Sequence, residues 1–350
     1  PNFHTQKTFL HHILNDNLFF VQSENYEFYV NPLMHLELGI DNEQRYVNSR
    51  GIQLKGRIGS KVRFSTSFYE NQMNVSDYVY DFMLSNNRIV PGQGMAKLNN
   101  HSISDDLDFS FAEAYVNYDA SRFFNIEFGH GKHFLGDGYR SLLLSDNSFN
   151  YPYLKITTNV WKFKYVNLFS SLQQLDFKID AVDISREKLN ATHYLSANIG
   201  SRFTINLFES IILGEDSLGN LFDINYFNPI IFYRPVEYSI GYSRLGNAIM
   251  GLGLKYKLSN LTHLYGQFVL DEFSLSEIRG NRGYWANKFG GQIGFKCFDF
   301  LGYENLSIQS ELNAVRPFTY SHKHPVLNYS HYSQPLAHPF GASCIENITI

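Results

Sequence analysis

Residues 316–338 hold the densest set of side chains able to do chemistry, histidines interleaved with tyrosines. The set comprises His322, His324, His331 and His338, with Tyr320, Tyr329 and Tyr332 among them. Imidazoles in a His-x-His pattern could ligate zinc or copper. A long loop that uses His and Tyr as hydrogen-bonding filler accounts for the same residues. We favour the second interpretation and expect neither a metal nor another cofactor.

Aromatic rings in the long loops could also stack on the apolar C–H faces of sugar rings. Candidates for such stacking are Tyr284, Trp285, Tyr320, Tyr329 and Tyr332. The alternative is again a structural role in packing the loops.

Paired carboxylates suggest hydrolysis at two places, Asp105-Asp106 and Asp271-Glu272. Glycoside hydrolysis needs two carboxylates about 5–9 Å apart on either side of the bond. Adjacent residues on a strand point to opposite faces, so Asp271 and Glu272 cannot form that pair. The chain also lacks a Gly-x-Ser-x-Gly elbow. We therefore expect a protein that is not an enzyme.

Residues 128–152, FGHGKHFLGDGYRSLLLSDNSFNYP, form the segment richest in glycine and polar groups. Its candidate ligand-binding or loop-anchoring residues are Gly129, His130, Gly131, Gly136, Gly138, Arg140, Ser145, Asp146 and Asn147. The Gly-x-Gly patterns lack the strand–turn–helix context of a dinucleotide site. The glycines permit tight turns, and the apolar run at residues 142–144 favours partial insertion of this loop into a protein interior.

Most of the chain alternates apolar and polar residues with a period of two. In residues 51–59, Ile52 and Leu54 alternate with Gln53 and Lys55. A strand points successive side chains to opposite faces, so these segments have one apolar and one polar face. The strands are long, numerous and rich in aromatics, which is typical of an all-β, transmembrane antiparallel β-barrel with a polar lumen.

Composition agrees with this fold class. The 350 residues have a mean hydropathy of -0.25 and are 16% aromatic, with 24 Tyr against 2 Trp. Tyrosine is typical of the interfacial girdles of membrane barrels. The longest apolar stretches fall far short of the roughly 20 residues of a spanning helix. With a net charge of -4 and no basic block, the chain is not expected to bind nucleic acid.

The pattern predicts a short amphipathic helix in the N-terminal segment, residues 1–16, followed by a barrel over residues 17–350. We count about fifteen strands and expect 14–18. Short turns alternate with long loops, which in outer-membrane barrels are periplasmic and external respectively. The last strand ends without the usual aromatic residue, so the final strands are expected to be missing from this sequence or supplied by a partner.

The polar faces carry charges of both signs, which are expected to point into the lumen. They are Lys55, Arg57, Arg63, Glu113, Lys255, Lys257, Lys288, Lys296 and Glu311. Internal filling by salt bridges is favoured over an ion-selective pore.

The segment around Phe134, Gly136 and Gly138, followed by residues 140–147 (RSLLLSDN) and Pro152, resembles the signature of the Wzi capsule-assembly family. Further runs, such as residues 228–238 (NPIIFYRPVEY) and 285–290 (WANKFG), resemble a branch of gliding-motility RemB-like proteins. The resemblance implies an outer-membrane barrel of about eighteen strands with a polar, mostly plugged interior. Phe134-Leu135 departs from the tryptophans that the capsule proteins tend to have.

The expected function is therefore to bind or organise surface polysaccharide, or to support gliding motility, in the bacterial outer membrane. The expected partners are membrane lipid or lipopolysaccharide, surface polysaccharide and other outer-membrane proteins. Two alternatives remain open: a structural subunit of a larger outer-membrane complex, and a diffusion channel for a small solute.

Overall fold

The computed structural model describes residues 16–40, 43–98, 106–175, 185–216, 219–221, 224–229, 244–272, 287–340 and 344–350. They fall into two compact units, Pro1–Ser121 with Asn125–Gly131, and Arg122–Phe124 with Lys132–Ile350. The helix expected near the N-terminus lies outside the described residues. Among the described helices, none has the length and apolar character needed to cross a membrane.

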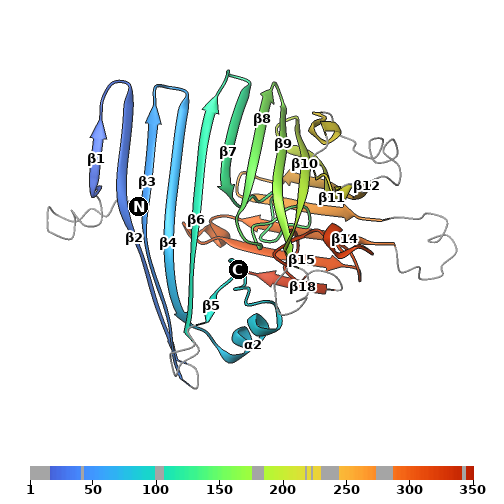
Figure 1. The fold of residues 1–350 in the computed structure, drawn as a ribbon. Helices are drawn as coiled ribbons and strands as arrows, with labels where there is room; N and C mark the ends of the chain where they lie inside the picture. Colours follow the sequence, from blue (N-terminus) through green and yellow to red (C-terminus); the bar gives the residue numbers. More distant parts are fainter. Residues whose placement is uncertain are drawn as a thin grey trace. The chain divides into compact units, whose positions relative to one another are not determined.

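The first unit is an antiparallel meander in the order β1-β2-β3-β4-β6-β7, with β5 paired to β6 (Figure 1). Its elements are β1 (Phe19–Gln22), β2 (Tyr26–Ile40), β3 (Gln44–Ile58), β4 (Val62–Asn74), α2 (Asp77–Ser85), β5 (Lys97–Leu98), β6 (Asp106–Asp119) and β7 (Phe124–Gly131). Helix α2 packs Met83 against Leu107 and Phe109 in a small apolar cluster.

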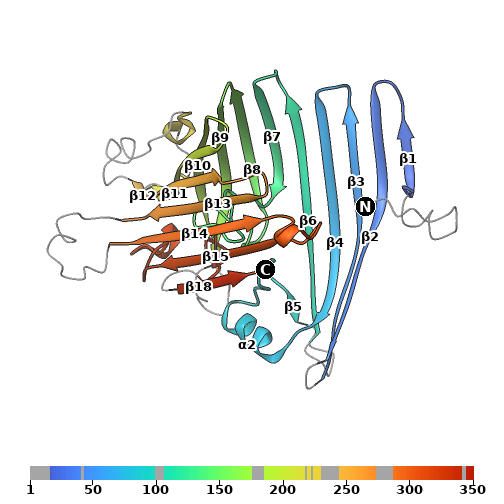
Figure 2. The same cartoon turned by 180° about the vertical axis from the view of Figure 1, so that it is seen from behind.

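The second unit continues the same pattern in the order β8-β9-β10-β11-β12-β13-β14-β15-β18 (Figure 2). Its main strands are β8 (Tyr151–Val160), β9 (Phe163–Leu175), β10 (Ser185–Ile199), β11 (Phe203–Asp216), β12 (Arg244–Lys257), β13 (Thr262–Leu270), β14 (Phe289–Cys297), β15 (Ile308–Val315) and β18 (Cys344–Thr349). The short elements are η1 (Ile224–Phe227), η3 (Phe300–Gly302), η4 (Pro325–Leu327), β16 (Ser330–His331) and β17 (Gln334–Pro335). The described strands of these meanders number 16, within the expected range.

The two faces of the sheets differ as the alternation predicts. In the first unit, hydrogen-bonded rows such as Ile52–Phe68–Ala112 form an apolar outer face. Lys55, Arg57, Arg63 and Glu113 lie on the opposite, inner face. In the second unit, Lys255, Lys257, Lys296 and Glu311 likewise share one face of the sheet. The apolar face is therefore built to contact lipid and the polar face to line an interior.

The alternation predicts separate strands over residues 26–30 and 36–40 and one strand over residues 155–169, and the structure differs at both places. Residues 26–30 and 36–40 belong to one strand, β2, which runs through Pro32. Residues 155–169 are a hairpin, because the chain reverses at Trp161 with a positive φ of 54°. The slip in alternation after Tyr165 has another cause, because Val166 and Leu168 on the opposite face of β9 are also apolar and are buried.

A polar row interrupts the outer face of the second unit. Asn167, His193 and Glu209 are cross-strand neighbours on β9, β10 and β11, and all three are buried. The η1 turn packs beside this row, with Tyr226 in the apolar cluster there and Phe227 stacked on Phe169 at 4.7 Å. Covering such a row matters because each unsatisfied polar group facing lipid costs several kcal/mol.

The division of faces gives a direct test. Leu54→Arg puts a charge in the middle of the outer apolar band, which should reduce the free energy of folding into a bilayer by about 2–4 kcal/mol. Gln53→Arg, on the inner face of the same strand, is the matched control and should cost far less. Urea titrations in phospholipid vesicles measure both. Equal losses would contradict the assignment of the faces.

Candidate functional site

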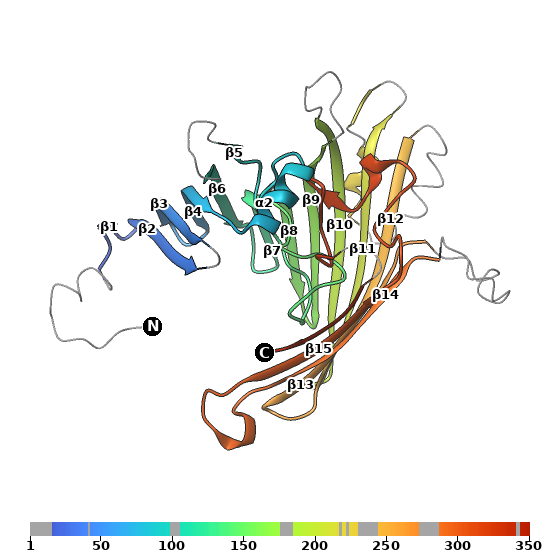
Figure 3. The ribbon, with the colours of Figure 1, turned by 90° about the horizontal axis from the view of Figure 1, so that it is seen from below.

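Residues 132–150 follow β7 and fold against the inner face of strands β13–β15 (Figure 3). The backbone of this segment comes closest to the strand side chains at Gly136 and Gly138. A Cβ atom at Gly136 would lie 2.4 Å from Nε2 of Gln267, and one at Gly138 would lie 2.4 Å from Oε2 of Glu311. These positions therefore need glycine because the strand side chains already occupy the space.

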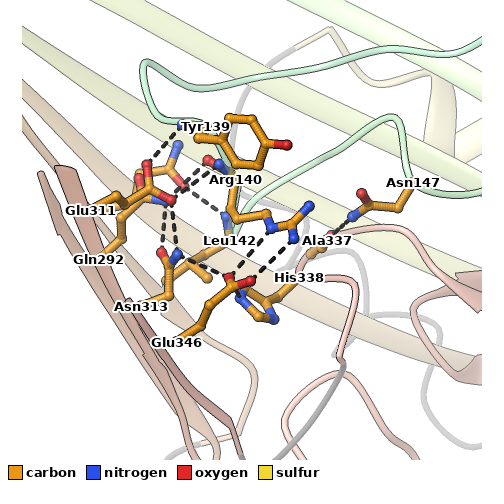
Figure 4. A network of polar contacts seen from close by, with 11 residues as sticks. Tyr139, Arg140, Leu142, Asn147, Gln292, Glu311, Asn313, Ala337, His338 and Glu346 are labelled. Carbon is orange, nitrogen blue, oxygen red and sulfur yellow. Dashed lines mark hydrogen bonds and ion pairs between the residues drawn. The ribbon is translucent and has the colours of Figure 1, made fainter. Parts of the chain in front are cut away.

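Three strand side chains take up the backbone hydrogen bonds of this segment (Figure 4). Gln267 accepts from the Leu142 N–H at 2.7 Å, and Gln292 donates to the Arg140 carbonyl at 3.0 Å. Glu311 accepts from the N–H groups of Tyr139 and Arg140 at 2.8 and 3.1 Å. Because an irregular backbone has no ladder of its own, these side chains replace the partners that a strand would have.

A second layer of polar contacts fixes the Arg140 side chain. Its guanidinium donates to Glu346 on β18, with an N···O distance of 3.1 Å in the ion pair. Glu346 also lies 2.9 Å from Nε2 of His338, and Asn313 donates to Glu311 at 2.8 Å. In Figure 4 the Glu346 carboxylate lies between Arg140 and His338. Burial lowers the pKa of His338, although the neighbouring carboxylate opposes this shift.

Residues 316–340 form a second inward segment that packs on the first. Leu142, Leu143 and Leu144 are buried in one apolar cluster with Tyr320 and Tyr329. The segments are also tied by hydrogen bonds, from the Tyr320 hydroxyl to the Leu142 carbonyl at 2.9 Å and from the Ser145 N–H to the Leu336 carbonyl at 2.6 Å. We call residues 132–150 and 316–340 together the plug.

Buried charged groups of the sheet hold the second segment. Lys188 on β10 donates to the Asn328 carbonyl at 2.8 Å, and Lys288 donates to the Ser321 carbonyl at 2.8 Å. Asp271 accepts from the Tyr320 N–H at 3.0 Å and lies 4.0 Å from Nζ of Lys288. Burial raises the pKa of Asp271 to about 7, even though the positive charge of Lys288 acts against this rise.

The predicted residues of the glycine-rich segment thus divide into two groups. Gly136, Gly138, Arg140, Ser145 and Asn147 belong to the plug, where Asn147 donates to the Ala337 carbonyl. Asp146 also lies there, and Ser145 donates to it at 3.4 Å. Gly129, His130 and Gly131 lie instead on β7 in the first unit, where Nδ1 of His130 contacts the Ala112 carbonyl at 2.9 Å.

The aromatic residues proposed for sugar stacking have other surroundings. The rings of Tyr320 and Tyr329 are buried in the plug, which leaves neither face open to a sugar. Tyr332 makes an edge contact with His331 at 4.6 Å. Tyr284 and Trp285 lie outside the described residues.

The histidines act as separate hydrogen-bonding groups. His331 accepts from the Gln173 N–H at 2.9 Å, and His322 accepts from the His324 N–H at 3.1 Å. His338 pairs with Glu346 as described above. Within the described part of the chain, no three His, Cys, Asp or Glu side chains are grouped as metal ligands.

The residues that sequence analysis missed are the amides Gln267, Gln292 and Asn313 and the carboxylate Glu346. Each lies on the polar face of its strand, so the alternation places it in the interior. No signal in the sequence distinguishes a side chain that holds a plug from one that faces water.

At the end of the second unit that carries the short turns, the inner face is basic. Arg202, Lys255, Lys257 and His263 line a cavity of about 360 Å³. The positive charges of Lys255, Lys257 and Lys296 all act on the His263 imidazole. Asp137 of the plug pairs with Lys255 at 2.6 Å. We call Arg202, Lys255, Lys257 and Lys296 the basic rim.

Several solved structures are similar to this chain. OccK3 (OpdO) of Pseudomonas aeruginosa is 12% identical with a TM-score of 0.44, covering 84% of this chain and 72% of that one. An anion-selective porin from Comamonas acidovorans is 9% identical with a TM-score of 0.38, over 92% and 97%. The outer membrane channel DcaP of Acinetobacter baumannii is 10% identical with a TM-score of 0.36, over 92% and 95%. No protein-family model and no curated protein matches the chain.

These findings correct the expected function. The similar structures include a porin and an outer-membrane channel, so they do not favour a protein that organises surface polysaccharide or supports gliding. The packing of residues 140–147 also disagrees with the expected function. These residues carried the resemblance to the capsule-assembly family, and they are largely packed inside the plug.

The fold and its two faces define the class of protein. Long antiparallel strands with an apolar outer face, a polar inner face and long connections at one end form a transmembrane β-barrel of the bacterial outer membrane.

The hydrogen bonds to Glu311 give the first test of the site. Glu311→Gln keeps the size of the side chain but replaces one acceptor oxygen by an NH2 group. A buried N–H left without an acceptor costs about 1–3 kcal/mol. Protease cleavage within residues 132–150 of the folded protein should therefore become about tenfold faster, because 1.4 kcal/mol corresponds to a factor of ten. Glu304→Gln, on an exposed turn, is the control, and equal cleavage of both variants would refute the anchoring role.

Asp271 gives a pH-dependent test. Its folded-state pKa of about 7 lies above the ordinary value of 3.8, so the folded protein binds a proton that the unfolded chain has lost. This group therefore lowers the stability of the folded state as the pH rises from about 4 to about 7. Asp271→Asn removes that effect, and its stability relative to wild type should increase over this range in urea titrations. A constant difference between the two proteins would show that Asp271 does not titrate there.

Proposed function

We propose that the protein is a diffusion channel of the outer membrane for small anionic solutes, with no enzymatic activity. The observation that carries this proposal is the basic rim on the inner face of the second unit, beside the short turns. Fixed positive charge along a low-dielectric wall concentrates anions and repels cations.

The plug and the rim have complementary roles in this proposal. The plug fills the inner face near the long loops, where Leu143 and its apolar neighbours cover Gly251 of β12. Asp137, the plug residue that contacts the rim, neutralises Lys255. Lys257 and Lys296 remain to set the sign of the potential beside the path of a solute.

Planar-bilayer recording of the full chain tests both parts of the proposal. We expect stepwise conductance and, in a KCl gradient, a reversal potential that favours chloride. Lys257→Glu/Lys296→Glu should shift the reversal potential towards the cation value, because the charge of the rim is reversed. Lys323→Glu changes an exposed lysine on the long-loop side and is the control.

Absence of conductance from inserted protein would refute the channel. Conductance that is equal for both ions, and unchanged by the double variant, would refute the anionic substrate class.

A further inference from the structure

The basic rim of the second unit contains a row of bases on three neighbouring strands. Lys257 on β12 is the cross-strand partner of His263 on β13, and His263 is the partner of Lys296 on β14. Arg202, in the turn before β11, lines the same cavity as Lys257 and His263. Like charges on neighbouring strands destabilise a sheet. A bound anion would remove this cost.

The first unit shows how the same chain balances the bases of an inner face. There, Glu27 lies opposite Arg57 and Arg57 lies opposite Arg63, also close to the short turns. Arg57 pairs with Glu27 at 3.4 Å, and Arg63 pairs with Asp119 at 2.9 Å. Each of these two guanidinium groups therefore has a carboxylate of its own.

The second unit lacks this balance. Asp137 of the plug pairs with Lys255 at 2.6 Å. Within the described part of the chain, no carboxylate forms an ion pair with the other three members of the basic rim. Their positive charges are therefore available to an ion from solution.

The side chains of the row can meet over β13. Neighbouring strands lie about 4.8 Å apart, so the Cα atoms of Lys257 and Lys296 are about 10 Å apart on either side of His263. Nζ of Lys296 leans towards β13 and lies 5.7 Å from the centre of the Tyr265 ring. That ring covers Gly294, where a Cβ atom would lie 2.5 Å from it. Two ammonium groups and an imidazole can thus reach one ion beside the ring.

The Tyr265 ring also separates this row from the plug. Its hydroxyl donates to Glu311 and accepts from Nε2 of Gln309, both at 2.8 Å. Glu311 is directed away from the row, because it accepts the backbone N–H groups of Tyr139 and Arg140. The nearest carboxylate of the plug anchor is therefore already engaged.

We infer that this row binds the dianionic phosphate group of a small solute, with Lys257 and Lys296 as charged donors and His263 between them. A phosphate group carries about two negative charges and three strong acceptor oxygens, which suit two ammonium groups and an imidazole around one point. Chloride or a monocarboxylate carries one charge and would neutralise only one member of the row. The inference rests on the proposed function for the path of the solute, and it narrows the solute class from small anions to phosphates.

Isothermal titration calorimetry of the full chain in detergent micelles tests the site without requiring conductance. The probe is inorganic phosphate at pH 8, where it is mainly a dianion. Wild type should bind it, and Lys257→Gln/Lys296→Gln should bind it at least about tenfold more weakly, because two hydrogen bonds from charged donors are lost. Asp137→Asn should bind phosphate more tightly, since Lys255 is then released to the ion. Lys162→Gln, on an exposed turn, is the control and should bind as wild type does.

Two further probes define the solute class. Glycerol 2-phosphate distinguishes the sources of the phosphate group: its binding extends the site to organic phosphates, and its exclusion restricts the site to the free ion. Succinate carries its two charges on separate carboxylates and should bind at least several-fold more weakly than phosphate.

Phosphate affinity that the double variant leaves unchanged, or succinate that binds as tightly as phosphate, would overturn the inference. Its failure is distinct from failure of the channel. A wild-type protein that conducts chloride but does not bind phosphate would overturn the phosphate site alone, whereas one that binds phosphate but does not conduct would refute the channel alone.

Discussion

An irregular segment can lie inside a membrane barrel only if its backbone finds hydrogen-bond partners, and the rest of this structure depends on how that demand is met. Three side chains on adjacent strands, Gln267, Gln292 and Glu311, supply those partners to residues 139–142. With the backbone satisfied, Leu142, Leu143 and Leu144 can pack against apolar residues of the inner face. The second inward segment then covers them, held by Lys188, Lys288 and Asp271 on the sheet.

Much of this fold follows from the sequence, because a period of two is a strong local signal. The alternation in residues 51–59 correctly places Ile52 outside and Lys55 inside. The apolar run at 142–144 correctly indicated insertion of the glycine-rich loop. The hairpin at Trp161 was missed because a turn of two residues leaves little trace in the pattern. The continuous strand through Pro32 was missed because a proline within an apolar run reads as a break in a strand.

The candidate site was only partly predictable. Arg140 and its glycines stood out by composition, whereas Gln267, Gln292 and Glu346 look like any other polar residues of an inner face. Which of them hold the plug depends on contacts between segments more than 100 positions apart in the sequence. Tyr320 and Tyr329 were candidates for sugar stacking because aromatic residues in a polar loop resemble a binding site. In the structure their rings pack in the interior.

The central claim is that residues 132–150 are fixed to the inner face through their backbone. Residue-resolved hydrogen–deuterium exchange of the folded protein in lipid discs measures this most directly. The account predicts that the amides of Tyr139, Arg140 and Leu142 exchange as slowly as those of the neighbouring strands β13 and β14. Exchange of these three amides at the rate of an open loop would contradict it.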